Sequence, residues 1–554
     1  MTMKRSGGRI LTDNLLAQGC DRIFHVPGES FLAVLDALHD IPAIDLVTCR
    51  QEGGAAFMAC ADGALTGKPG ICFVTRGPGA TNASIGVHVA MQDSIPMILF
   101  IGDVDRSMRD REGFQEVDFP AMFAPLAKWA TRIEDAARIP EYIARAWRVA
   151  TSGRPGPVVI ALPEDMLTDT VEATDRPRLS PVERSLSPDA LTPMLDLLRT
   201  AERPFAIVGG AGWDAASGEA FDAFARSWGL PVAGAFRRQD AISNTSPVWA
   251  GNLGYGPNPK LVERVKQADL ILAVGARLGE ATTDGYTLIA PDHPGQTLVH
   301  IQPDAGELDH VYRTDMAIAA SMAEFGAAIA AVTPPHQPHP AGQAANAEWR
   351  DWSTPQPREG VALDLGQCVA AMRERMAADD TIICNGAGNF SSWWHRYWRY
   401  GHLGTQLAPT AGAMGYGVPA AVAAALRRPK KTAVALAGDG DFLMNGQELA
   451  TAAQHGADLL IILIDNSGYG TIRMHQEREY PERISGTTLA NPDFAALARA
   501  YGGWAVTIER TDQFAPALNE ALERSGIRMI HCRTDIAVIN PATTIEKIRS
   551  HRPA

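Results

Sequence analysis

The sequence predicts an α/β fold made of three doubly wound parallel-sheet domains. Short runs of Val, Ile and Leu alternate with helical stretches in three successive blocks, which is the rhythm of βαβ units. Two proline-rich polar stretches, 174–189 and 333–357, separate the blocks and are predicted to be linkers. The predicted domains are therefore residues 1–175, 190–332 and 360–554.

Each block contains apolar runs of the length expected for buried strands of a parallel sheet. The first block has LVTC, ICFVT, MILFIG and VVIAL; the second has PFAIVGG, LILAVGARLG and TLVHIQPD; the third has TIICNGAG, TAVALAGDG, LLIILIDN and MIHCRTD. No short-period repeat is visible. The similar rhythm of the blocks is compatible with duplication or with the common α/β pattern alone.

The composition is that of a globular enzyme, with 554 residues, 46% hydrophobic and 20% charged. The net charge of −13 argues against nucleic acid or an anionic membrane as the main partner. Seven scattered cysteines without metal-ligand spacing indicate reduced thiols. Neither a signal peptide nor a run of roughly 20 apolar residues is evident. A cytoplasmic protein without a membrane partner is therefore predicted.

Asp439 and Asn466 each end an apolar run, and a single helix is predicted between the two runs. Its predicted start is Asn445 as N-cap with Glu448 three residues on, and its predicted end is Gly456. Strands joined by one crossover are usually neighbours, and ligands of open parallel sheets lie beyond the carboxyl ends of the strands. The carboxylate and the amide oxygen are therefore expected to converge, as oxygen ligands of Mg²⁺ do.

Gly438 and Gly440 flank the acid. Without side chains, they would let backbone N–H groups approach an anion, which would place a diphosphate beside the metal. An ordinary strand-end turn is the alternative explanation for a GDG sequence taken alone.

The stretch GDGDFLMNGQELATAAQHGADLLIILIDNSGYGTIRMHQE resembles the signature of thiamin diphosphate (ThDP) enzymes, in which GDG precedes an Asn by about 25 residues. Here 25 residues separate Gly440 from Asn466. The usual Asn-Asn pair of the family is Asp465-Asn466, so the second position, the ligand, keeps its amide. The resemblance implies that Asp439, Asn466 and the backbone carbonyl of Gly468 bind Mg²⁺.

Two other stretches of the third block resemble the same family. TAGAMGYGVPAAVAAAL, 410–426, resembles the segment that holds the aminopyrimidine. The resemblance implies that Gly412 contacts the cofactor and that Met414 props it in a V shape. CNGAGNF, 384–390, falls where the family offers backbone N–H groups to the phosphates, with Gly388 and Asn389 as the implied donors.

Glu52 follows the apolar run IDLVTC and precedes GGAAFMACADGAL, a small apolar helix that is predicted to be buried. Burial would raise the pKa of this carboxyl, so that it could hold a proton near neutrality. A helix N-terminal carboxylate favoured by the dipole is the alternative. TCRQEGGAAFMACADGAL resembles the catalytic-glutamate stretch of ThDP enzymes. The resemblance implies that Glu52 donates a proton to N1′ of the pyrimidine, which lets the 4′-imine activate C2 of the thiazolium.

Further residues of the first block match the family. Pro27, Thr75 and Asn82 match positions that line the pyrimidine. GFQEVD, 113–118, resembles the acetolactate-synthase and oxalyl-CoA-decarboxylase branch. There the resemblance implies that Gln115 faces the substrate and that Phe114 forms an apolar wall.

Four other positions of this block are less defined. His25 and Glu29 lie in a loop that is expected to reach the site, and His25 is a candidate catalytic residue, with a partly buried loop residue as the alternative. His88 is expected to lie in the core. Arg76 stands where most relatives have Ser before GPG, and the sequence assigns it no role. The paired His of pyruvate-type decarboxylases are missing, which favours carboligation or a thioester substrate over simple aldehyde release.

The resemblance also bears on assembly and on the central domain. In the family the cofactor lies between the first domain of one subunit and the third of its neighbour, so a homodimer is implied at minimum and a homotetramer is common. Some relatives bind FAD or ADP in the central domain. Here VGGAGWDAASG, 208–218, and VGARLGEATTDGY, 274–286, are loose Gly-rich turns, which are weak indicators of a nucleotide. An empty central domain is favoured, with FAD as the alternative.

Together these resemblances imply ThDP- and Mg²⁺-dependent decarboxylation and carboligation of a small 2-oxo acid or acyl-CoA-type substrate, with acetolactate formation from two pyruvates as the leading case. A benzoylformate- or oxalyl-CoA-like decarboxylase and a 2-hydroxyacyl-CoA lyase are the alternatives. A nucleotide-dependent dehydrogenase is disfavoured because no clean GxGxxG with an acid about 20 residues on is present. A catalytically silent homologue is disfavoured because Glu52, Asp439 and Asn466 are all retained.

Overall fold

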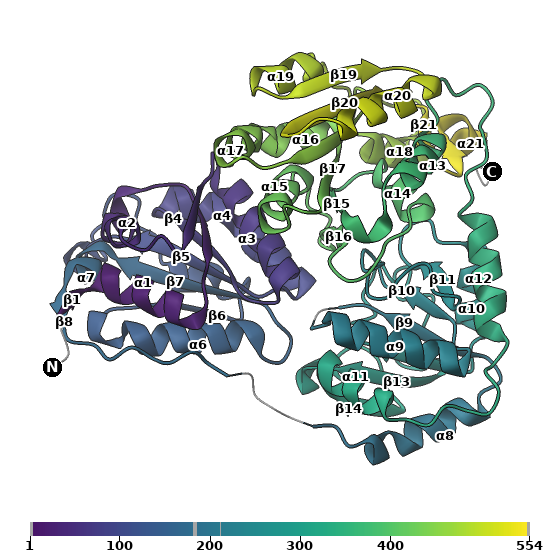
Figure 1. Cartoon of the computed structure of the whole chain (residues 1–554), viewed down its shortest axis with the longest axis horizontal. Coiled ribbons are helices and arrows are strands. Elements are labelled where there is room, and N and C mark those ends of the chain that lie inside the picture. Colours follow the sequence, from purple (N-terminus) through teal and green to yellow (C-terminus); the bar gives the residue numbers. More distant parts are fainter. Residues whose placement is uncertain (1–3, 181–184, 211, 551–554) are drawn as a thin grey trace. The chain divides into compact units, whose positions relative to one another are not determined.

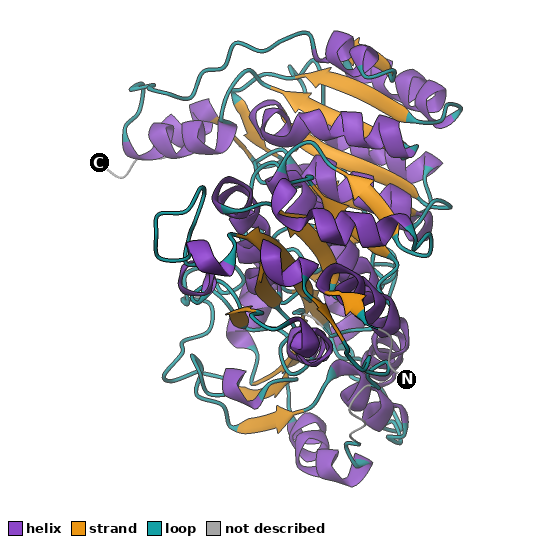
Figure 2. Cartoon of the chain, turned by 90° about the vertical axis from the view of Figure 1, so that its left-hand side faces the viewer, coloured by secondary structure: helices purple, strands orange, loops and turns teal. Residues whose placement is uncertain are grey.

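The structure, a computed structural model, describes residues 4–180, 185–210 and 212–550. They form three six-stranded sheets flanked by helices (Figures 1 and 2), as predicted from the sequence. The chain packs as two compact units. The first consists of Met1–Val182, Val418–Pro429 and Asn445–Ala457, and the second of Glu183–Gly417, Lys430–Met444 and Asp458–Ala554.

The first sheet is parallel, with the strand order β3-β2-β4-β5-β7-β6. Its strands are β2 (Arg22–His25), β3 (Asp45–Thr48), β4 (Gly70–Val74), β5 (Met97–Asp103), β6 (Trp129–Arg132) and β7 (Pro157–Pro163). Its helices are α1 (Gly7–Gln18), α2 (Leu32–His39), α3 (Glu52–Thr66), α4 (Gly77–Asp93), α5 (Phe119–Phe123), α6 (Ile139–Thr151) and α7 (Glu164–Thr168), with short 3₁₀ turns η1 (Glu29–Phe31), η2 (Arg106–Met108) and η3 (Ala136–Arg138). A short antiparallel pair joins β1 (Arg5–Ser6) to β8 (Thr170–Val171).

Both faces of this sheet are covered, and this explains why its strands read as continuous apolar runs. Ile71 and Phe73 of β4 pack into the core that α1 and α6 cover. Alternate residues point to the opposite face, against which α3 and α4 pack. The small residues of these helices allow a close approach, since a Cβ on Gly86 would lie only 2.4 Å from the Cβ of Ala56.

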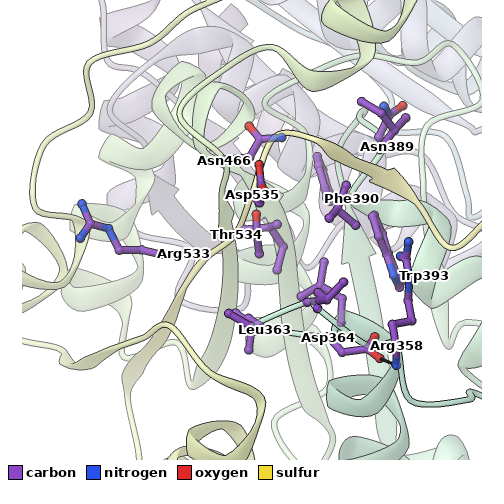
Figure 3. Close-up of a pocket in the computed structure, with 17 residues that line it drawn as sticks. Arg358, Leu363, Asp364, Asn389, Phe390, Trp393, Asn466, Arg533, Thr534 and Asp535 are labelled. Carbon is purple, nitrogen blue, oxygen red and sulfur yellow. Dashed lines mark hydrogen bonds between the residues drawn. The ribbon is translucent and has the colours of Figure 1, made fainter. Parts of the chain in front are cut away.

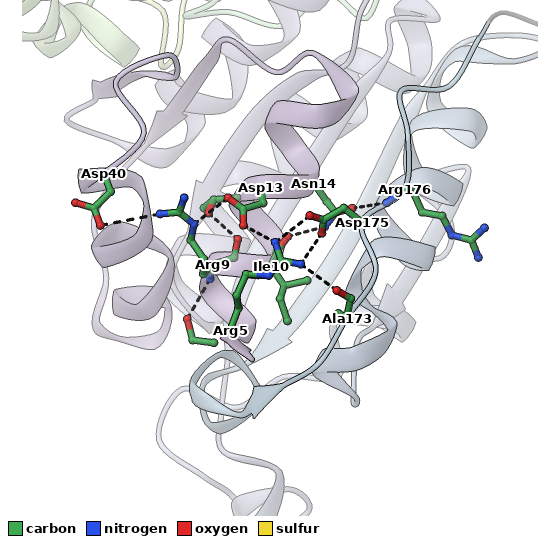
Figure 4. Close-up of polar contacts among 11 residues, drawn as sticks. Arg5, Arg9, Ile10, Asp13, Asn14, Asp40, Ala173, Asp175 and Arg176 are labelled. Carbon is green, nitrogen blue, oxygen red and sulfur yellow. Dashed lines mark hydrogen bonds and ion pairs between the residues drawn. The ribbon is translucent and has the colours of Figure 1, made fainter. Parts of the chain in front are cut away.

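Arg5 anchors the N-terminal strand (Figure 4). Its guanidinium donates to Asp13 at 2.5 Å, to Asp175 at 2.8 and 2.9 Å, and to the carbonyl of Ala173 at 3.1 Å. Asn14 of α1 also donates to Asp175, at 2.7 Å. One arginine therefore holds the chain that follows β8 against helix α1.

Arg5→Ala is expected to lower the free energy of unfolding by roughly 2 kcal/mol, because several charge-assisted hydrogen bonds of a side chain that is only 16% exposed are lost. Chemical denaturation measures this change. The control is Arg9→Ala, since Arg9 pairs with Asp13 but its side chain is 39% exposed, so its loss is expected to cost less than about 1 kcal/mol. Equal effects of the two variants would contradict the anchoring role.

The central sheet has the order β11-β10-β9-β12-β13-β14. Numbered along the chain this is 3-2-1-4-5-6, the order of dinucleotide-binding domains. Its strands are β9 (Pro204–Val208), β10 (Val232–Gly234), β11 (Trp249–Asn252), β12 (Leu270–Val274), β13 (Thr297–Gln302) and β14 (Met316–Ala319). Its helices are α8 (Thr192–Thr200), α9 (Ala215–Trp228), α10 (Pro259–Gln267), α11 (Met322–Ala330) and α12 (Ala341–Trp352), with η4 (Pro188–Leu191) and η5 (Ala305–Glu307).

The third sheet has the order β16-β15-β17-β18-β20-β19. Its strands are β15 (Thr381–Asn385), β16 (Gln406–Leu407), β17 (Thr432–Gly438), β18 (Leu459–Asp465), β19 (Trp504–Ile508) and β20 (Ile527–Arg533), followed by the small pair β21 (Val538–Asn540) and β22 (Thr543–Thr544). Its helices are α13 (Leu365–Arg375), α14 (Ser391–Tyr397), α15 (Gly417–Arg427), α16 (Asp439–Asn445), α17 (Leu449–His455), α18 (Gly470–Glu479), α19 (Phe494–Ala500), α20 (Thr511–Leu522) and α21 (Ile545–Ser550), with η6 (Ala378–Asp380) and η7 (Gly446–Glu448).

The first and third sheets share one topology. Numbered along each block, both have the strand order 2-1-3-4-6-5, whereas the central sheet differs. In such sheets the order reverses between the first and third strands, and a crevice opens there at the carboxyl ends. In this chain those positions are the ends of β2 and β4 in the first sheet and of β15 and β17 in the third.

Two local predictions are wrong. The stretch 333–357 is not an unbroken linker, because it contains α12, whose Trp349 and Asn346 are buried. The Ala-rich sequence between its prolines is a good helix former. Asn445 does not cap a helix with its side chain, and the helical segment breaks there between α16 and η7. Gly456 ends α17 in the left-handed conformation, as predicted.

Candidate active site

The carboxyl ends of β17 and β18 bring Asp439 and Asn466 together. The strands are hydrogen-bonded neighbours, with Gly438 opposite Ile464. The Oδ2 of Asp439 and the Oδ1 of Asn466 both accept from the backbone N–H of Gly468, at 3.1 and 3.2 Å. The structure therefore places the two predicted oxygen ligands as their spacing indicates.

Asp439 belongs to a polar network that the sequence did not reveal. Asn491 donates from its amide nitrogen to Asp439 at 2.7 Å and to Asp465 at 2.8 Å. His531 contacts the other oxygen of Asp465 at 3.0 Å. The only indication of this network in the sequence is the acid at position 465, where the family has an amide.

The charges of this network suit a cation. Burial raises the pKa of Asp439, and the nearby Asp465 carboxylate raises it further. Burial also acts to raise the pKa of Asp465, but the hydrogen bonds from His531 and Ser467 outweigh it and lower this pKa to about 2. A divalent ion beside Asp439 would favour the ionised carboxylate, so the residues present fit the predicted metal.

The predicted set has one carboxylate, one amide and one backbone carbonyl. The carbonyl of Gly468 accepts from the N–H of Gly470 at 2.9 Å and keeps a second lone pair. In the part of the chain that the structure describes, no group of three or more His, Cys, Asp or Glu is arranged to hold a metal.

A cavity of about 220 Å³ lies at this edge of the sheet. Its lining includes the predicted cofactor residues Gly388, Asn389, Gly412, Met414, Gly438, Asp439, Gly440, Asn466 and Gly468. A Cβ on Gly438 would lie 2.9 Å from the ring of Phe390, and one on Gly440 would lie 2.6 Å from the ring of Tyr469. Glycine is therefore required on both sides of Asp439, and the resulting backbone cradle fits a diphosphate.

Asn389 differs from its predicted role. Its backbone N–H is already engaged, because it donates to the hydroxyl of Thr471 at 3.0 Å, and that hydroxyl donates back to the Asn389 side-chain oxygen at 2.9 Å. The side-chain Nδ2 is buried and has no partner among the residues 4–180, 185–210 and 212–550. Of the two donors that Asn389 offers, only its side-chain amide, whose oxygen is held by Thr471, thus remains for an anion in the cavity.

A second cavity of about 160 Å³ adjoins the first (Figure 3). The two share Asn389, Phe390, Ile464 and Asn466. Arg358 and Asp364 lie at one end, where the backbone N–H of Arg358 donates to Asp364 at 3.0 Å. Asn466 therefore lines both the cavity beside Asp439 and this second cavity.

In the first unit, Glu52 is the first residue of α3 and lies at the carboxyl edge of the first sheet. Most of α3 is buried, as predicted, but the Glu52 side chain itself is partly exposed. Its Oε2 accepts from the amide of Asn82 on α4 at 2.9 Å. His88, on the same helix, is exposed and not in the core, so that expectation is wrong.

Pro27 and Thr75 lie at the reversal point of this sheet, just beyond the ends of β2 and β4. A Cβ on Gly28 would lie 2.4 Å from the Cβ of Thr75, so the two loops approach closely. The Thr75 hydroxyl is 2.9 Å from that of Ser30. The structure therefore brings the proposed pyrimidine-lining residues to one edge.

Gln115 and Arg76 lie in adjoining loops of this edge. The carbonyl of Gln115, whose φ is +63°, accepts from the N–H of Gly77 at 3.0 Å. Phe114 is 72% exposed. Arg76 is buried and pairs with Glu164 at 2.5 Å and Glu29 at 3.3 Å. Arg76 therefore joins the first residue of η1 to the first residue of α7 at this edge of the sheet.

His25 is 3% exposed, and its Nε2 lies 3.1 Å from the hydroxyl of Thr48. Burial, helped by the neighbouring His455, lowers the pKa of His25 to about 4, so the ring is neutral at pH 7. This setting favours a structural role, and its catalytic role stays a prediction.

Among the described residues, no helix is long and apolar enough to cross a membrane. All seven cysteines are buried and free of disulfides.

Comparison with known proteins extends these findings to the whole chain. Three family models match: "Thiamine pyrophosphate enzyme, N-terminal TPP binding domain" over residues 5–122, the "central domain" of the same family over 191–329, and its "C-terminal TPP binding domain" over 386–532. The large subunit of acetolactate synthase isozyme 2 from Escherichia coli (strain K12) is 31% identical over 542 residues, which cover 96% of each chain.

Two further relatives agree. The acetolactate synthase large subunit of Parasynechococcus marenigrum (strain WH8102) is 32% identical, covering 95% of this chain and 87% of that one. The acetolactate synthase of Bacillus subtilis (strain 168) is 27% identical, covering 96% and 94%. The similarity spans all three sheets, including the strand ends that carry Glu52 and Asp439. It shows that this chain belongs to the thiamine pyrophosphate enzyme family, as a ThDP-dependent enzyme similar to acetolactate synthases.

Proposed function

We propose that this protein decarboxylates a 2-oxo acid and transfers the remaining acyl unit to a second carbonyl compound, as an acetolactate synthase does, with ThDP and Mg²⁺. One observation carries the proposal: side-chain oxygens of Asp439 and Asn466 both accept from the backbone N–H of Gly468, and they lie beside a glycine-lined cavity of about 220 Å³. The acetolactate synthases to which the chain is similar support the choice of a small 2-oxo acid.

The residues around Asp439 and those around Glu52 would have different tasks. Asp439, Asn466 and the carbonyl of Gly468 would hold Mg²⁺, and the Asn389 amide would donate to a phosphate oxygen. When bound, ThDP supplies a thiazolium that acts as the electron sink for decarboxylation. Glu52 would hold the proton for the pyrimidine.

The substrate-facing residues of the first unit would act differently. Gln115 would orient the substrate, and the exposed ring of Phe114 would exclude water from it. Pro27, Thr75 and Asn82 would line the pyrimidine.

The assembly is proposed to be a homodimer at minimum, and a homotetramer by similarity. Glu52 is partly exposed, and Ile85, one turn from Asn82 on α4, is 41% exposed. An apolar residue beside the proposed acid is expected where a second copy packs. A cytoplasmic location remains a prediction from composition.

The test is a product assay with purified protein, ThDP and Mg²⁺ on a panel of pyruvate, 2-oxobutyrate, benzoylformate and oxalyl-CoA. Release of CO₂ from pyruvate together with acetolactate, measured as acetoin after acid treatment, supports the proposal. Free aldehyde without a carboligation product would indicate a simple decarboxylase. Turnover only with oxalyl-CoA would indicate the thioester branch.

The purified protein is expected to be colourless and not to take up added FAD. Gly210 and Gly275 of the central domain have a structural reason for being glycine, since a Cβ on Gly210 would lie 1.9 Å from the carbonyl oxygen of Gly275. These turns therefore need no nucleotide to explain them, although the strand order is one that binds nucleotides. A flavin absorption band that persists through gel filtration would contradict this expectation.

A further inference from the structure

Glu448, the last residue of η7, is a buried carboxylate that lies against the first turn of α3, the helix that begins with Glu52. Its side chain is 0% exposed. Its Oε1 accepts from the backbone N–H of Gln51 at 2.9 Å, and both oxygens lie 3.2 Å from the N–H of Arg50. The hydroxyl of Thr451 donates to Oε2 at 2.6 Å. A residue 397 positions away thus satisfies the two backbone donors that immediately precede Glu52.

Gly54 leaves the space that the Glu448 carboxylate occupies. A Cβ on Gly54 would lie 2.7 Å from the Oε1 of Glu448, so no other residue fits there without displacing the carboxylate. Gln51, the N-cap of α3, accepts from the N–H of Gly54 with its own side chain at 3.0 Å. The start of α3 is therefore held by its own N-cap side chain, Gln51, and by the side chain of Glu448 from η7.

Helix α17, which follows Glu448, also contacts the residues that precede Glu52. The N–H of Thr48 donates to the Nε2 of His455 at 3.0 Å, and the guanidinium of Arg50 donates to Gln454 at 2.6 Å. Residues 48–51, which join β3 to α3, thus lie against η7 and α17. Loops carry catalytic groups accurately only when such contacts remove their freedom.

We propose that Glu448 is a positioning residue for the active-site acid: it fixes residues 48–51 and thereby the direction in which Glu52 presents its carboxyl. The proposal rests on the proposed function, in which Glu52 holds the proton. A carboxylate suits this place because three donors point at it and because negative charge is favoured at a helix N-terminus. Glutamine could accept with one oxygen only, and its NH₂ group would face a donor.

The test uses Glu448→Gln and the shorter Glu448→Asp in the full chain. The readout is the rate of deuterium exchange at C2 of bound ThDP, which needs no substrate. Misplacement of the acid is expected to slow this exchange by about 10- to 100-fold in Glu448→Gln, with a smaller effect in Glu448→Asp. The affinities for ThDP and Mg²⁺ are expected to be unchanged, because Asp439 and Asn466 are untouched.

The double variant Glu52→Gln/Glu448→Gln separates positioning from a general structural effect. If Glu448 acts through Glu52, the second substitution causes no further slowing in the Glu52→Gln background. An equal fold-loss in both backgrounds would overturn the proposal. Unaltered exchange in Glu52→Gln alone would instead overturn the role of Glu52 in the proposed function, so the two failures are distinguishable.

A measurement without cofactor provides the second readout. Amide exchange of a peptide covering residues 46–55 is expected to accelerate in Glu448→Gln, and unchanged protection would also overturn the proposal. The matched control is Asp240→Asn. Asp240 is likewise buried and accepts from the N–H groups of Gly404, Thr405 and Gln406 at 2.8 to 3.1 Å. This control is expected to lower stability without changing exchange at residues 46–55.

Discussion

Glu52→Gln is expected to keep ThDP bound but to lower turnover by about 100- to 10,000-fold, the usual contribution of a positioned general acid. Glutamine can still accept from Asn82, which donates to Glu52 at 2.9 Å, so the local fold is retained. The amide cannot exchange a proton with the pyrimidine. Steady-state kinetics measure the loss in kcat, and fluorescence titration measures ThDP affinity.

Glu141→Gln serves as the control, because Glu141 is an exposed carboxylate on α6 and its loss is expected to leave turnover unchanged. Near-normal rates in Glu52→Gln would refute the proton role.

Mixing Glu52→Gln with Asp439→Ala tests whether Glu52 and Asp439 of one active site come from the same subunit or from two subunits. If different subunits supply them, random dimers regain roughly a quarter of the activity. If one subunit supplies both, the mixture stays inactive.

Asp439→Ala is expected to weaken ThDP binding by at least about 100-fold, and most strongly at low Mg²⁺, because the only carboxylate of the proposed ligand set is lost. Calorimetric titration of ThDP at several Mg²⁺ concentrations measures this dependence. Affinity that is unchanged and independent of Mg²⁺ would place the metal elsewhere.

The same variant makes a prediction for the protein without cofactor. The Asp439 carboxyl is buried beside Asp465, and its raised pKa shows that the charged form is disfavoured there. Asp439→Ala removes this charge but also removes the acceptor of the hydrogen bonds from Asn491 and Gly468. Because the two effects oppose each other, the unfolding temperature without metal is expected to stay close to that of the parent. The control is Glu509→Ala, an exposed residue that pairs with Arg533 and is expected to change neither property.

Features that depend on local order along the chain were predictable. The apolar runs became strands of three parallel sheets because a strand buried on both faces needs a continuous apolar run. The convergence of Asp439 and Asn466 followed because one crossover makes their strands neighbours. Glu52 was placed at the start of a buried helix by the small residues that follow it.

Features that depend on contacts between distant segments were not predictable. Glu448 looked like the second half of a capping box around Asn445, yet its partners are the N–H groups of Arg50 and Gln51. Asn491 carries no local signal, although it joins Asp439 to Asp465. Arg76 had no assigned role until the structure placed it between Glu29 and Glu164.

By itself the sequence determined the fold class and the strand ends that carry the site, because periodicity and spacing along the chain govern these features, and its resemblance to ThDP enzymes indicated the cofactor. Only the tertiary structure decided which side chains support the site, such as Asn491 behind Asp439 and Glu448 beneath Glu52. The reason is physical: a buried polar group takes whichever partner the packed chain brings within hydrogen-bond distance, and that partner can lie hundreds of residues away.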